Sequence, residues 1–433
     1  MMMQEKLAAL RLPEPIAVVG MGVSGKSAFR YLQAAGYQVQ AFDGKAQGEI
    51  LPLCLNDPAQ FAAFATLIVS PGIDRRTAAI ASAGGEVIND VELFARLVEK
   101  PVLAVTGSNG KSTVVSMLAE TLSALGQRVR LCGNIGRPVL EALFDAPQET
   151  DCYVVELSSY QLEVCPSLQI AVGAIVNITP DHLDRYDSFA DYAQAKANLA
   201  RQSAVCVLNA DDAQCTALAD LAAQTLFYGK GKAACVQDDA LWLDGEKVLD
   251  TRQLSVYGAH NAANALVALL MLRAFGADMA EAAAALCLFK GLPHRMVLVG
   301  EYGGVRYLND SKATNIGATA AALAGISAPI YLIAGGVGKN QDFKELAQVI
   351  LQSSVKKVLL IGVDNRDMQA ALQTGGIDYV DCGEMHHAVQ YAKQAAQAGD
   401  WVLLSPATAS FDQFSGYDAR GSCFAYEVQN QCQ

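Results

Sequence analysis

The chain has 433 residues, of which 52% are hydrophobic and 18% charged, and its formal net charge is −12. This length suggests about three domains, and the apolar share excludes a disordered chain. Because an acidic chain without a basic run is a poor nucleic-acid binder, we expect no nucleic-acid partner.

The mean hydropathy is +0.21, but no stretch approaches the roughly 20 apolar residues of a membrane span. The N-terminus lacks the apolar core of a signal peptide. The 11 cysteines are scattered singly, without C-x-x-C, as is typical of free thiols in a reducing cytosol. We therefore expect a cytoplasmic protein without membrane insertion or a zinc site, and we expect a monomer.

Short apolar runs alternate with Ala/Leu-rich amphipathic stretches, a pattern that predicts repeated βα units and parallel sheets. In the first series we expect strands at 15–20, 38–42 and 66–70 and helices at 24–35 and 90–99. In the second we expect strands at 102–105, 152–156, 174–177 and 204–208, an antiparallel excursion at 235–249 and a helix at 261–275. In the third we expect strands at 305–308, 330–334, 358–361 and 401–404, and the last ten residues look loosely held.

A first glycine-rich loop, Gly20 to Ser27, satisfies both G-x-G-x-x-G and G-x-x-x-x-G-K-S. Asp43 follows Gly25 by 18 residues, where a ribose hydroxyl is often held. Taken alone, this loop could bind a dinucleotide or a nucleoside triphosphate. Its glycines could also serve only the close packing of a strand against a helix.

A second loop, TGSNGKST, spans Thr106 to Thr113, although Val105 stands where the strict P-loop has its first glycine. It follows an apolar strand and opens a helix, so backbone N–H groups and the helix N-terminus face a phosphate. Lys111 can neutralise a β or γ oxygen, and Ser112 or Thr113 can ligate Mg²⁺. The loop therefore predicts a triphosphate site, with contacts from Gly107, Asn109, Gly110, Lys111, Ser112 and Thr113.

Carboxylates at neighbouring strand ends favour the second loop over the first. Glu156 ends the strand at 152–156, where it can meet the metal of a nucleotide. The strand at 174–177 runs into Thr179-Pro-Asp-His182-Leu-Asp, and a histidine flanked by carboxylates is a plausible second metal ligand. No equivalent carboxylates follow the first loop, so we assign the triphosphate to the second.

Three further clusters leave alternatives open. Asn261 and Asn264 share one face of a helix, where Asn261 could cap the helix or both could bind adenine. Arg295 lies at a domain break and could reach a phosphate. The polar run at 309–315 follows a strand, and it could be a turn or a site.

These motifs resemble those of the Mur ligases, the ATP-dependent amino-acid ligases of peptidoglycan synthesis. The resemblance covers essentially the whole chain and rests on TGSNGKST, ELSSYQLE, NITPDHLDRY, YAQAK, HNAANAL, GLPHR, NDSKATN, GGVGKNQDF and SPATASFDQF. GLPHR, NDSKATN and SPATASFDQF are most similar to the branch of the family that adds D-glutamate.

The resemblance implies three α/β domains: a Rossmann-like domain at 1–90 for the UDP-linked substrate, a central P-loop ATPase-type domain at 91–292 with a parallel sheet and a small antiparallel part, and a Rossmann-like domain at 293–433 for D-glutamate. It implies that ATP activates UDP-N-acetylmuramoyl-L-alanine as an acyl phosphate, which D-glutamate attacks, with release of ADP and phosphate. The alternatives are a Mur ligase of another amino-acid specificity, a dehydrogenase that uses the Gly20 loop, and a nucleotide-dependent switch or scaffold.

The resemblance also implies roles for individual residues. The UDP-linked substrate would contact Val23, Ser24, Asp43, Ser70, Gly72, Asn134, Ser158 and His182. ATP would further contact Asn261, Asn264, Arg295 and Asp310. Two Mg²⁺ ions would be held by Ser112, Glu156, His182 and Lys196, the last carbamylated, and the catalytic residues would be Lys111, His182 and Lys196. D-Glutamate would be bound by Lys312, Thr314, Lys339, Ser410 and Tyr417, the last standing where the family has phenylalanine. By its helical position alone, Lys196 would face solvent.

Overall fold

The computed structural model describes residues 3–145, 147–181, 185–256, 258–324, 326–338 and 341–432. The fold is α/β, with three sheets in which most neighbouring strands are parallel. The chain divides into two compact units, which are described separately. Unit 1 comprises Met1–Gln237, Leu241–Val248 and Ala265–Leu286, and unit 2 comprises Asp238–Ala240, Leu249–Asn264 and Cys287–Gln433.

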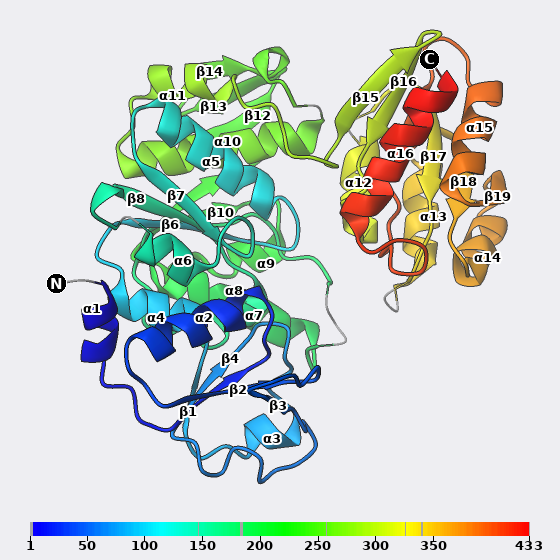
Figure 1. The fold of residues 1–433 in the computed structure, drawn as a ribbon. Helices are drawn as coiled ribbons and strands as arrows, with labels where there is room; N and C mark the ends of the chain where they lie inside the picture. Colours follow the sequence, from blue (N-terminus) through cyan, green and yellow to red (C-terminus); the bar gives the residue numbers. More distant parts are fainter. Residues whose placement is uncertain are drawn as a thin grey trace. The chain divides into compact units, whose positions relative to one another are not determined.

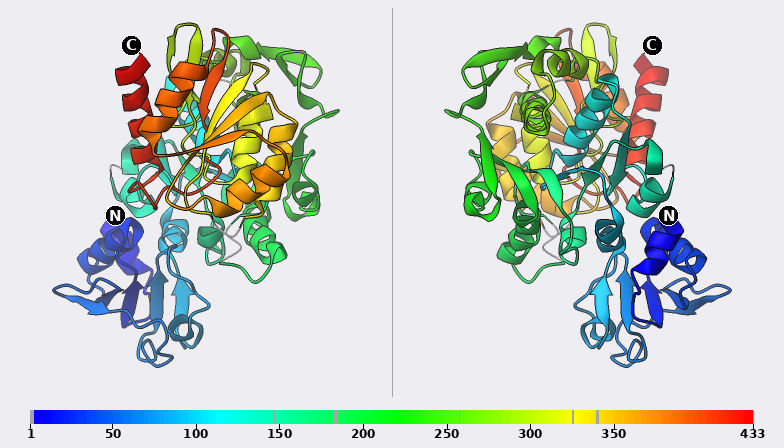
Figure 2. Two further views of the ribbon diagram at one scale, coloured as in Figure 1. Left: turned by 90° about the vertical axis from the view of Figure 1, so that its right-hand side faces the viewer. Right: turned by 90° about the vertical axis from the view of Figure 1, so that its left-hand side faces the viewer.

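The first sheet of unit 1 has five parallel strands in the order β3-β2-β1-β4-β5 (Figure 1; Figure 2, blue strands). Its central strands β1 and β4 are buried along their whole length, because apolar clusters cover both faces. Such strands read as continuous apolar runs, which is why the sequence located them. The strands are β1 (Ile16–Val19), β2 (Val39–Asp43), β3 (Ile50–Pro52), β4 (Thr66–Val69) and β5 (Glu86–Ile88), and the helices are α1 (Met3–Ala9), α2 (Val23–Ala34), α3 (Ala78–Ala81) and α4 (Asp90–Leu97).

The second sheet has the order β14-β13-β12-β11-β10-β9-β6-β8-β7, and β6 pairs in parallel with β9 and β8. In Figure 1, α2 and α4 lie between this sheet and the first, and one apolar core joins them. The strands are β6 (Val102–Thr106), β7 (Val129–Gly133), β8 (Cys152–Glu156), β9 (Ile170–Ile175), β10 (Ser203–Asn209), β11 (Gln224–Tyr228), β12 (Ala234–Gln237), β13 (Ala240–Leu243) and β14 (Glu246–Asp250), and the helices are α5 (Lys111–Ala124), α6 (Val139–Phe144), α7 (Ser159–Leu162), α8 (Phe189–Arg201), α9 (Ala213–Thr216), α10 (Ala259–Phe275) and α11 (Met279–Leu286).

Two details of this sheet bear on the sequence predictions. Asp244 and Gly245 join β13 to β14 with φ values of 52° and 83°, the positive values that a two-residue hairpin turn requires. The strand expected at 174–177 is wrong in position, because β9 ends at Ile175. Asn177 therefore lies in the loop after the strand, where its amide is free to bind other loops.

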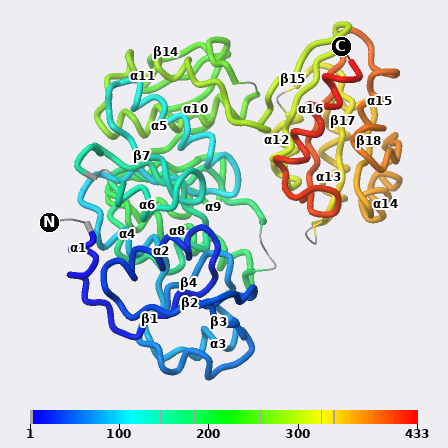
Figure 3. The backbone as a smooth tube through the Cα atoms, in the orientation of Figure 1, coloured from blue at the N-terminus to red at the C-terminus, as the bar shows by residue number. Residues whose placement is uncertain are grey.

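The third sheet, in unit 2, has the order β15-β16-β20-β17-β18-β19, with β15 antiparallel to β16 and the other pairs parallel. Helices α12 to α14 pack on one face and α15 and α16 on the other (Figure 3). The strands are β15 (Val297–Tyr302), β16 (Val305–Asn309), β17 (Ile330–Ala334), β18 (Val355–Ile361), β19 (Tyr379–Gly383) and β20 (Trp401–Leu404), and the helices are α12 (Ile316–Ala324), α13 (Phe343–Leu351), α14 (Arg366–Thr374), α15 (Met385–Ala395) and α16 (Tyr417–Cys432).

The expectation of a loosely held C-terminus is wrong. Helix α16 continues to Cys432, and Phe424 and Val428 are fully buried against the sheet. Their spacing of four residues places both on the same helix face. Within the described ranges, no helix combines the length and apolarity that crossing a membrane requires.

Gly25 is required where α2 packs on the first glycine-rich loop. A Cβ at Gly25 would lie 1.9 Å from the Gly20 carbonyl oxygen, whereas one at Gly22 would meet no atom within 4 Å. We predict that Gly25→Ala destabilises the protein by about 1–3 kcal/mol through overpacking, measured as a lower denaturant midpoint. Gly22→Ala is the matched control and should leave the midpoint nearly unchanged; equal effects of the two changes would contradict this explanation.

Candidate active site

The loop between β6 and α5 has the backbone of a phosphate-binding loop. Gly110 adopts a left-handed conformation, φ 87°, immediately before the first residue of α5. Gly107, φ 153°, is also a position that favours glycine, because a Cβ there would lie only 3.3 Å from the backbone N and O of Asn177. The loop thus passes directly into the helix N-terminus, where free N–H groups favour an anion.

Asn177 holds this loop from the end of β9. Its Oδ1 accepts hydrogen bonds from the N–H groups of Ser108 (3.1 Å) and Asn109 (2.8 Å), and its Nδ2 donates to the Asn109 carbonyl (3.1 Å). The Ser108 hydroxyl donates to the Thr179 carbonyl at 2.8 Å and lies 2.9 Å from the Tyr192 hydroxyl. The loop is therefore fixed to the NITPD segment and to α8. The sequence analysis did not assign Asn177 or Tyr192 a role.

Two lysines meet at one carbonyl of the loop. Lys111 Nζ donates to the Gly107 carbonyl at 2.7 Å and to the Ser108 carbonyl at 3.0 Å. Lys196 Nζ donates to the same Gly107 carbonyl at 2.8 Å and lies 4.6 Å from the centre of the Tyr192 ring. The expectation of a solvent-facing Lys196 is wrong, because the residue is only 2% exposed. Burial, and secondarily the nearby Lys111, hold the pKa of Lys196 well below its usual range.

Glu156 ends β8 beside Val105 of β6, and it is 1% exposed. Its Oε1 accepts a hydrogen bond from the Asn134 side-chain amide at 2.7 Å, while its buried Oε2 has no hydrogen-bond partner among the residues that the structure describes. An unpaired buried carboxylate oxygen is costly unless a cation satisfies it. This oxygen therefore fits a divalent cation with oxygen ligands. Ser112, in the first turn of α5, is also buried.

The rest of the expected metal set is only partly visible. His182 lies outside the described residues. Among the residues that the structure does describe, no cluster of three or more His, Cys, Asp or Glu side chains is placed to hold a metal. Electrostatic interactions of Lys196 with Glu156 and Asp181 place these three groups in one region.

A pocket of about 480 Å³ in unit 1 brings together five of the eight residues expected to contact the UDP-linked substrate. They are Val23, Ser24, Ser70, Gly72 and Asn134. Asp43 and Ser158 do not line it. Asp43 accepts hydrogen bonds from the N–H groups of Met21 and Lys45, which lower its pKa, and Ser158 caps α7. The sequence analysis missed Gln161, which lines the pocket three residues after Ser158.

In unit 2, Asn261 and Asn264 are each 5% exposed, and the Asn264 amide donates to Asn261 Oδ1 at 3.3 Å. The shared helix face is thereby confirmed. Since α10 begins at Ala259, Asn261 lies inside the helix and is not its cap.

The polar run at 309–315 is packed against α16 in unit 2. Lys312 Nζ lies 3.9 Å from the centre of the Tyr417 ring, and the Ser311 hydroxyl donates to the Tyr417 carbonyl at 2.8 Å. Ser410 is buried, Thr314 is half-buried, and Lys339 lies outside the described residues. The structure therefore brings two of the expected D-glutamate residues, Lys312 and Tyr417, into contact.

Arg420 joins two of the recognised motifs, and the sequence analysis missed it. Its guanidinium donates to the Ser311 hydroxyl (3.0 Å), the Ser311 carbonyl (2.9 Å) and the Thr408 carbonyl (3.1 Å), and its Nη1 is buried without a partner in the described part of the chain. Burial lowers the pKa of Arg420 to about 10. The spacing of Arg420, Phe424 and Val428, four residues each, was the available signal that all three are buried.

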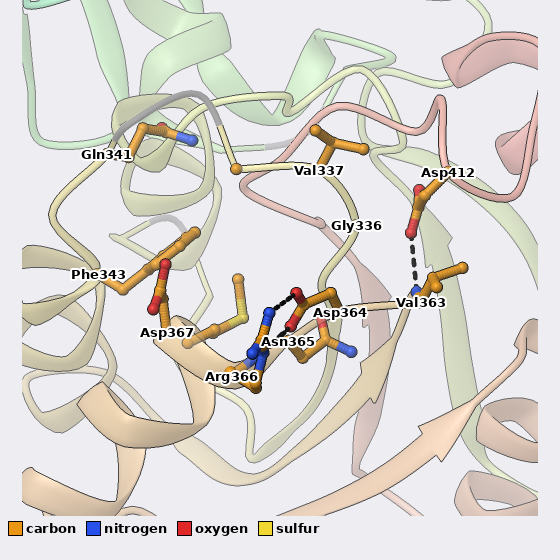
Figure 4. Close-up of a pocket in the computed structure, with 12 residues that line it drawn as sticks. Gly336, Val337, Gln341, Phe343, Val363, Asp364, Asn365, Arg366, Asp367 and Asp412 are labelled. Atoms are coloured by element: carbon orange, nitrogen blue, oxygen red, sulfur yellow. Dashed lines mark hydrogen bonds and ion pairs between the residues drawn. The ribbon is translucent and has the colours of Figure 1, made fainter.

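A second pocket, of about 410 Å³, lies in unit 2 at the ends of β17 and β18 (Figure 4). Three aspartates line it, and one of them, Asp364, pairs with Arg366 at 2.5 Å. Asp412 accepts a hydrogen bond from the Val363 N–H at 3.0 Å, as Figure 4 shows. None of Lys312, Thr314, Ser410 and Tyr417 lines this pocket.

Models of two protein families match the chain: the Mur ligase middle domain at residues 105–272, and the Mur ligase glutamate ligase domain at residues 294–408. Similar proteins include UDP-N-acetylmuramoylalanine--D-glutamate ligases from Alcanivorax borkumensis (42% identical; 96% of this chain and 98% of the relative), Chromobacterium violaceum (41%; 94% and 96%) and Escherichia coli K12 (38%; 95% and 97%).

Solved structures with a similar fold include UDP-N-acetylmuramate-alanine ligase from Thermotoga maritima (TM-score 0.62, 17% identity, 96% of this chain and 99% of that chain) and MurF from Acinetobacter baumannii (TM-score 0.63, 16%, 96% and 92%). The fold and the loop define an α/β protein with a P-loop. The chain belongs to the Mur ligase family, which confirms the resemblance found in the sequence.

Asp310, expected near ATP, gives a pH-dependent prediction. Burial raises its pKa to about 7, opposed by the hydrogen bond that it accepts from the Ser405 hydroxyl (3.0 Å) and by Arg295. Between about pH 4 and 7 the folded protein holds a proton that the unfolded chain, with the ordinary value of 3.8, releases. This contribution to stability is therefore complete at low pH and is lost as the pH rises to about 7.

The comparison is between wild type and Asp310→Asn, which cannot titrate. The unfolding free energy of wild type should fall relative to that of Asp310→Asn from about pH 4 to about pH 7, and the difference should then stay constant. Denaturant titrations of both proteins across this range measure it, and a pH-independent difference would contradict the prediction.

Proposed function

We propose that this chain is an ATP-dependent ligase that adds D-glutamate to UDP-N-acetylmuramoyl-L-alanine in peptidoglycan precursor synthesis. The observation that carries the proposal is the cluster at the P-loop: two lysines on the Gly107 carbonyl with the unpaired oxygen of Glu156 in the same region. The D-glutamate specificity is supported by relatives of that name at 38–42% identity over nearly the full chain.

In this proposal the P-loop positions the ATP phosphates. The N–H groups at the start of α5 face the triphosphate, and Lys111, now donating to loop carbonyls, turns its ammonium to the transferring phosphoryl group. Mg²⁺ held by Ser112 and Glu156, with His182 and a carbamate on Lys196 for a second ion, would offset phosphate charge. The alanine carboxylate attacks the γ-phosphorus of ATP, whose bond to the bridging oxygen breaks, so that ADP leaves and an acyl phosphate forms. The neutral D-glutamate amine then attacks the carbonyl carbon, phosphate leaves, and the nitrogen loses a proton to give the amide.

The remaining assignments are part of the same proposal. Asn261, Asn264, Arg295 and Asp310 would contact ATP, and Lys312, Thr314, Lys339, Ser410 and Tyr417 would contact D-glutamate. Three domains at 1–90, 91–292 and 293–433 are supported by the three sheets, one in each range, although the first boundary falls in the first turn of α4. The monomeric state and the cytoplasmic location stay predictions.

Phosphate release from ATP tests the activity. It should require Mg²⁺, UDP-N-acetylmuramoyl-L-alanine and D-glutamate together, because the acyl phosphate turns over only when an amine consumes it. A panel of D-glutamate, L-glutamate, L-alanine and a diamino acid tests the specificity. Equal rates with D- and L-glutamate, or a preference for the diamino acid, would exclude the D-glutamate assignment while leaving the ligase class intact.

The two glycine-rich loops are distinguished by their lysines. Lys111→Ala should lose about 3–4 kcal/mol of transition-state stabilisation, a rate loss of roughly a hundred- to a thousandfold. Lys26→Ala is the matched control, because Lys26 is exposed and holds the equivalent place in the Gly20 loop. Steady-state kinetics of both variants measure the effect, and a larger loss in Lys26→Ala would mean that the loops are assigned in reverse.

Lys196 should depend on carbon dioxide. A depressed pKa favours the neutral amine, which attacks CO₂ to form an N–C bond and releases a proton, leaving a carbamate anion. With isotopically labelled bicarbonate, wild type should give a carbamate resonance that Lys196→Ala lacks. The variant should be nearly inactive, and millimolar short carboxylic acids should partly restore its activity. Full activity of Lys196→Ala would remove the residue from the mechanism.

A further inference from the structure

A turn after β4, formed by Ser70 to Ile73, lines the pocket expected to hold the UDP-linked substrate. The turn closes on itself through a hydrogen bond from the Ile73 N–H to the Ser70 carbonyl at 3.0 Å. It is fixed to the first glycine-rich loop by the Ser70 hydroxyl, which donates to the Gly20 carbonyl at 2.6 Å. One side of the turn is thus anchored within the first sheet.

Arg185 holds the other side. Its Nη2 donates to the Ile73 carbonyl at 3.0 Å and to the Pro71 carbonyl at 3.4 Å, and its Nη1 donates to the Gly72 carbonyl at 3.3 Å. The guanidinium also lies 4.2 Å from the centre of the Tyr160 ring. A planar fork of donors can bind three successive carbonyls and stack on an aromatic ring at once, which a lysine ammonium cannot do.

These contacts fix the direction of a backbone donor. In a planar trans peptide the carbonyl and the following N–H point in opposite directions. Because Arg185 holds the Pro71 carbonyl, the Gly72 N–H is directed away from Arg185. Among the described residues no acceptor is found for this N–H. Gly72 lines the pocket together with Val23 and Ser24, in the first turn of α2, whose N–H groups have no acceptor within the helix.

Two of the four glycines that line this pocket, Gly22 and Gly72, are not explained by packing. A Cβ at Gly72 or at Gly22 would meet no protein atom within 4 Å, and neither residue has a positive φ. Both positions could therefore carry a side chain without strain, but that side chain would occupy the pocket. This pattern fits a ligand that approaches the backbone closely, and the N-terminus of α2, which lines the same pocket, favours an anionic one.

We propose that Arg185 is a positioning residue for the UDP-linked substrate: it holds the 70–73 turn so that the Gly72 N–H donates to the substrate diphosphate. The inference rests on the proposed function, in which this pocket binds the nucleoside diphosphate. Among the described residues, the contacts of the Arg185 guanidinium are with the turn carbonyls, the Tyr160 ring and, at 3.9 Å, the carboxylate of Asp74. Its effect on the substrate is exerted through the backbone.

The test is direct binding of UDP, without ATP, to the full-length protein by calorimetry. Arg185→Ala should weaken UDP binding roughly ten- to a hundredfold, the loss expected when a well-placed hydrogen bond to a charged group is removed. Arg185→Lys should be intermediate. Arg76→Ala is the matched control, since Arg76 links the same two segments through its ion pair with Asp187, and it should leave UDP affinity within about twofold.

Two further measurements separate positioning from a general structural role. Arg185→Ala should bind uridine, which lacks the diphosphate, as wild type does, and it should bind MgADP unchanged. In turnover, KM for the UDP-linked substrate should rise while KM for ATP and for D-glutamate stays constant. If Arg185→Ala does not fold, Arg185→Lys and Gly72→Ala carry the test, and Gly72→Ala should lose UDP affinity at unchanged thermal stability.

Equal UDP affinity in wild type and Arg185→Ala would overturn this inference alone. Parallel losses of uridine, UDP and MgADP binding would also overturn it, because they would indicate a structural defect. If wild type binds MgADP but not UDP, the assignment of the pocket fails, and the proposed function fails with it.

Discussion

The carbonyl oxygen of Gly107 accepts hydrogen bonds from both Lys111 and Lys196, and the electrostatics of the site depend on which of the two amino groups carries a proton charge. Two ammonium groups on one buried carbonyl would repel each other strongly in a low dielectric. Lys196 is 2% exposed, whereas Lys111 is half-buried, and burial, followed by the nearby Lys111, lowers the pKa of Lys196. The neutral amine of Lys196 is therefore favoured at this carbonyl.

The surrounding side chains keep these two lysines in place. Asn177 ties the loop to the end of β9, and Tyr192 lies under the Lys196 amine while its hydroxyl meets Ser108. The Tyr192 ring makes an edge contact with Tyr186, which stacks on Tyr160, and the Arg185 guanidinium lies over the Tyr160 ring. A row of aromatic rings in contact therefore runs from the P-loop to the 70–73 turn, which lines the pocket expected for the UDP-linked substrate.

Asn134 provides a second link within unit 1. It lines the pocket expected for the UDP-linked substrate, and its amide holds one oxygen of Glu156 while leaving the other unpaired. In unit 2, Arg420 makes a similar link: its buried guanidinium donates hydrogen bonds to both Ser311 and Thr408. In both units a buried polar side chain with one unsatisfied atom stands at the motifs that identified the family. An unsatisfied buried polar atom is costly, so each of these two atoms calls for a partner such as an ion, a water or a bound substrate.

Local sequence determined the elements and the loops of this protein. The buried strands β1, β4, β6 and β8 read as apolar runs because both faces of a parallel sheet are covered, and TGSNGKST indicated a phosphate loop despite Val105, because a strand, a glycine turn and a helix N-terminus suffice. The wider set of motifs identified the family. These signals are local, since they depend on residues within one turn or one strand.

Tertiary structure decided burial and partners. Lys196, read from its helix as solvent-facing, is enclosed because Tyr192 and the P-loop close over that face of α8. Arg185 stands within the NITPDHLDRY motif, and Arg420 lies at helical spacing from Phe424 and Val428, but neither signal indicated what these side chains bind. Their partners include backbone carbonyls 112 to 114 residues away for Arg185, and 12 and 109 residues away for Arg420. Backbone carbonyls have no residue-specific signature, so only the fold shows which side chain meets them. The sequence indicated the candidate site residues, and the packing of distant segments determined which of them are buried, which are held by hydrogen bonds, and which have an atom left unpaired among the described residues.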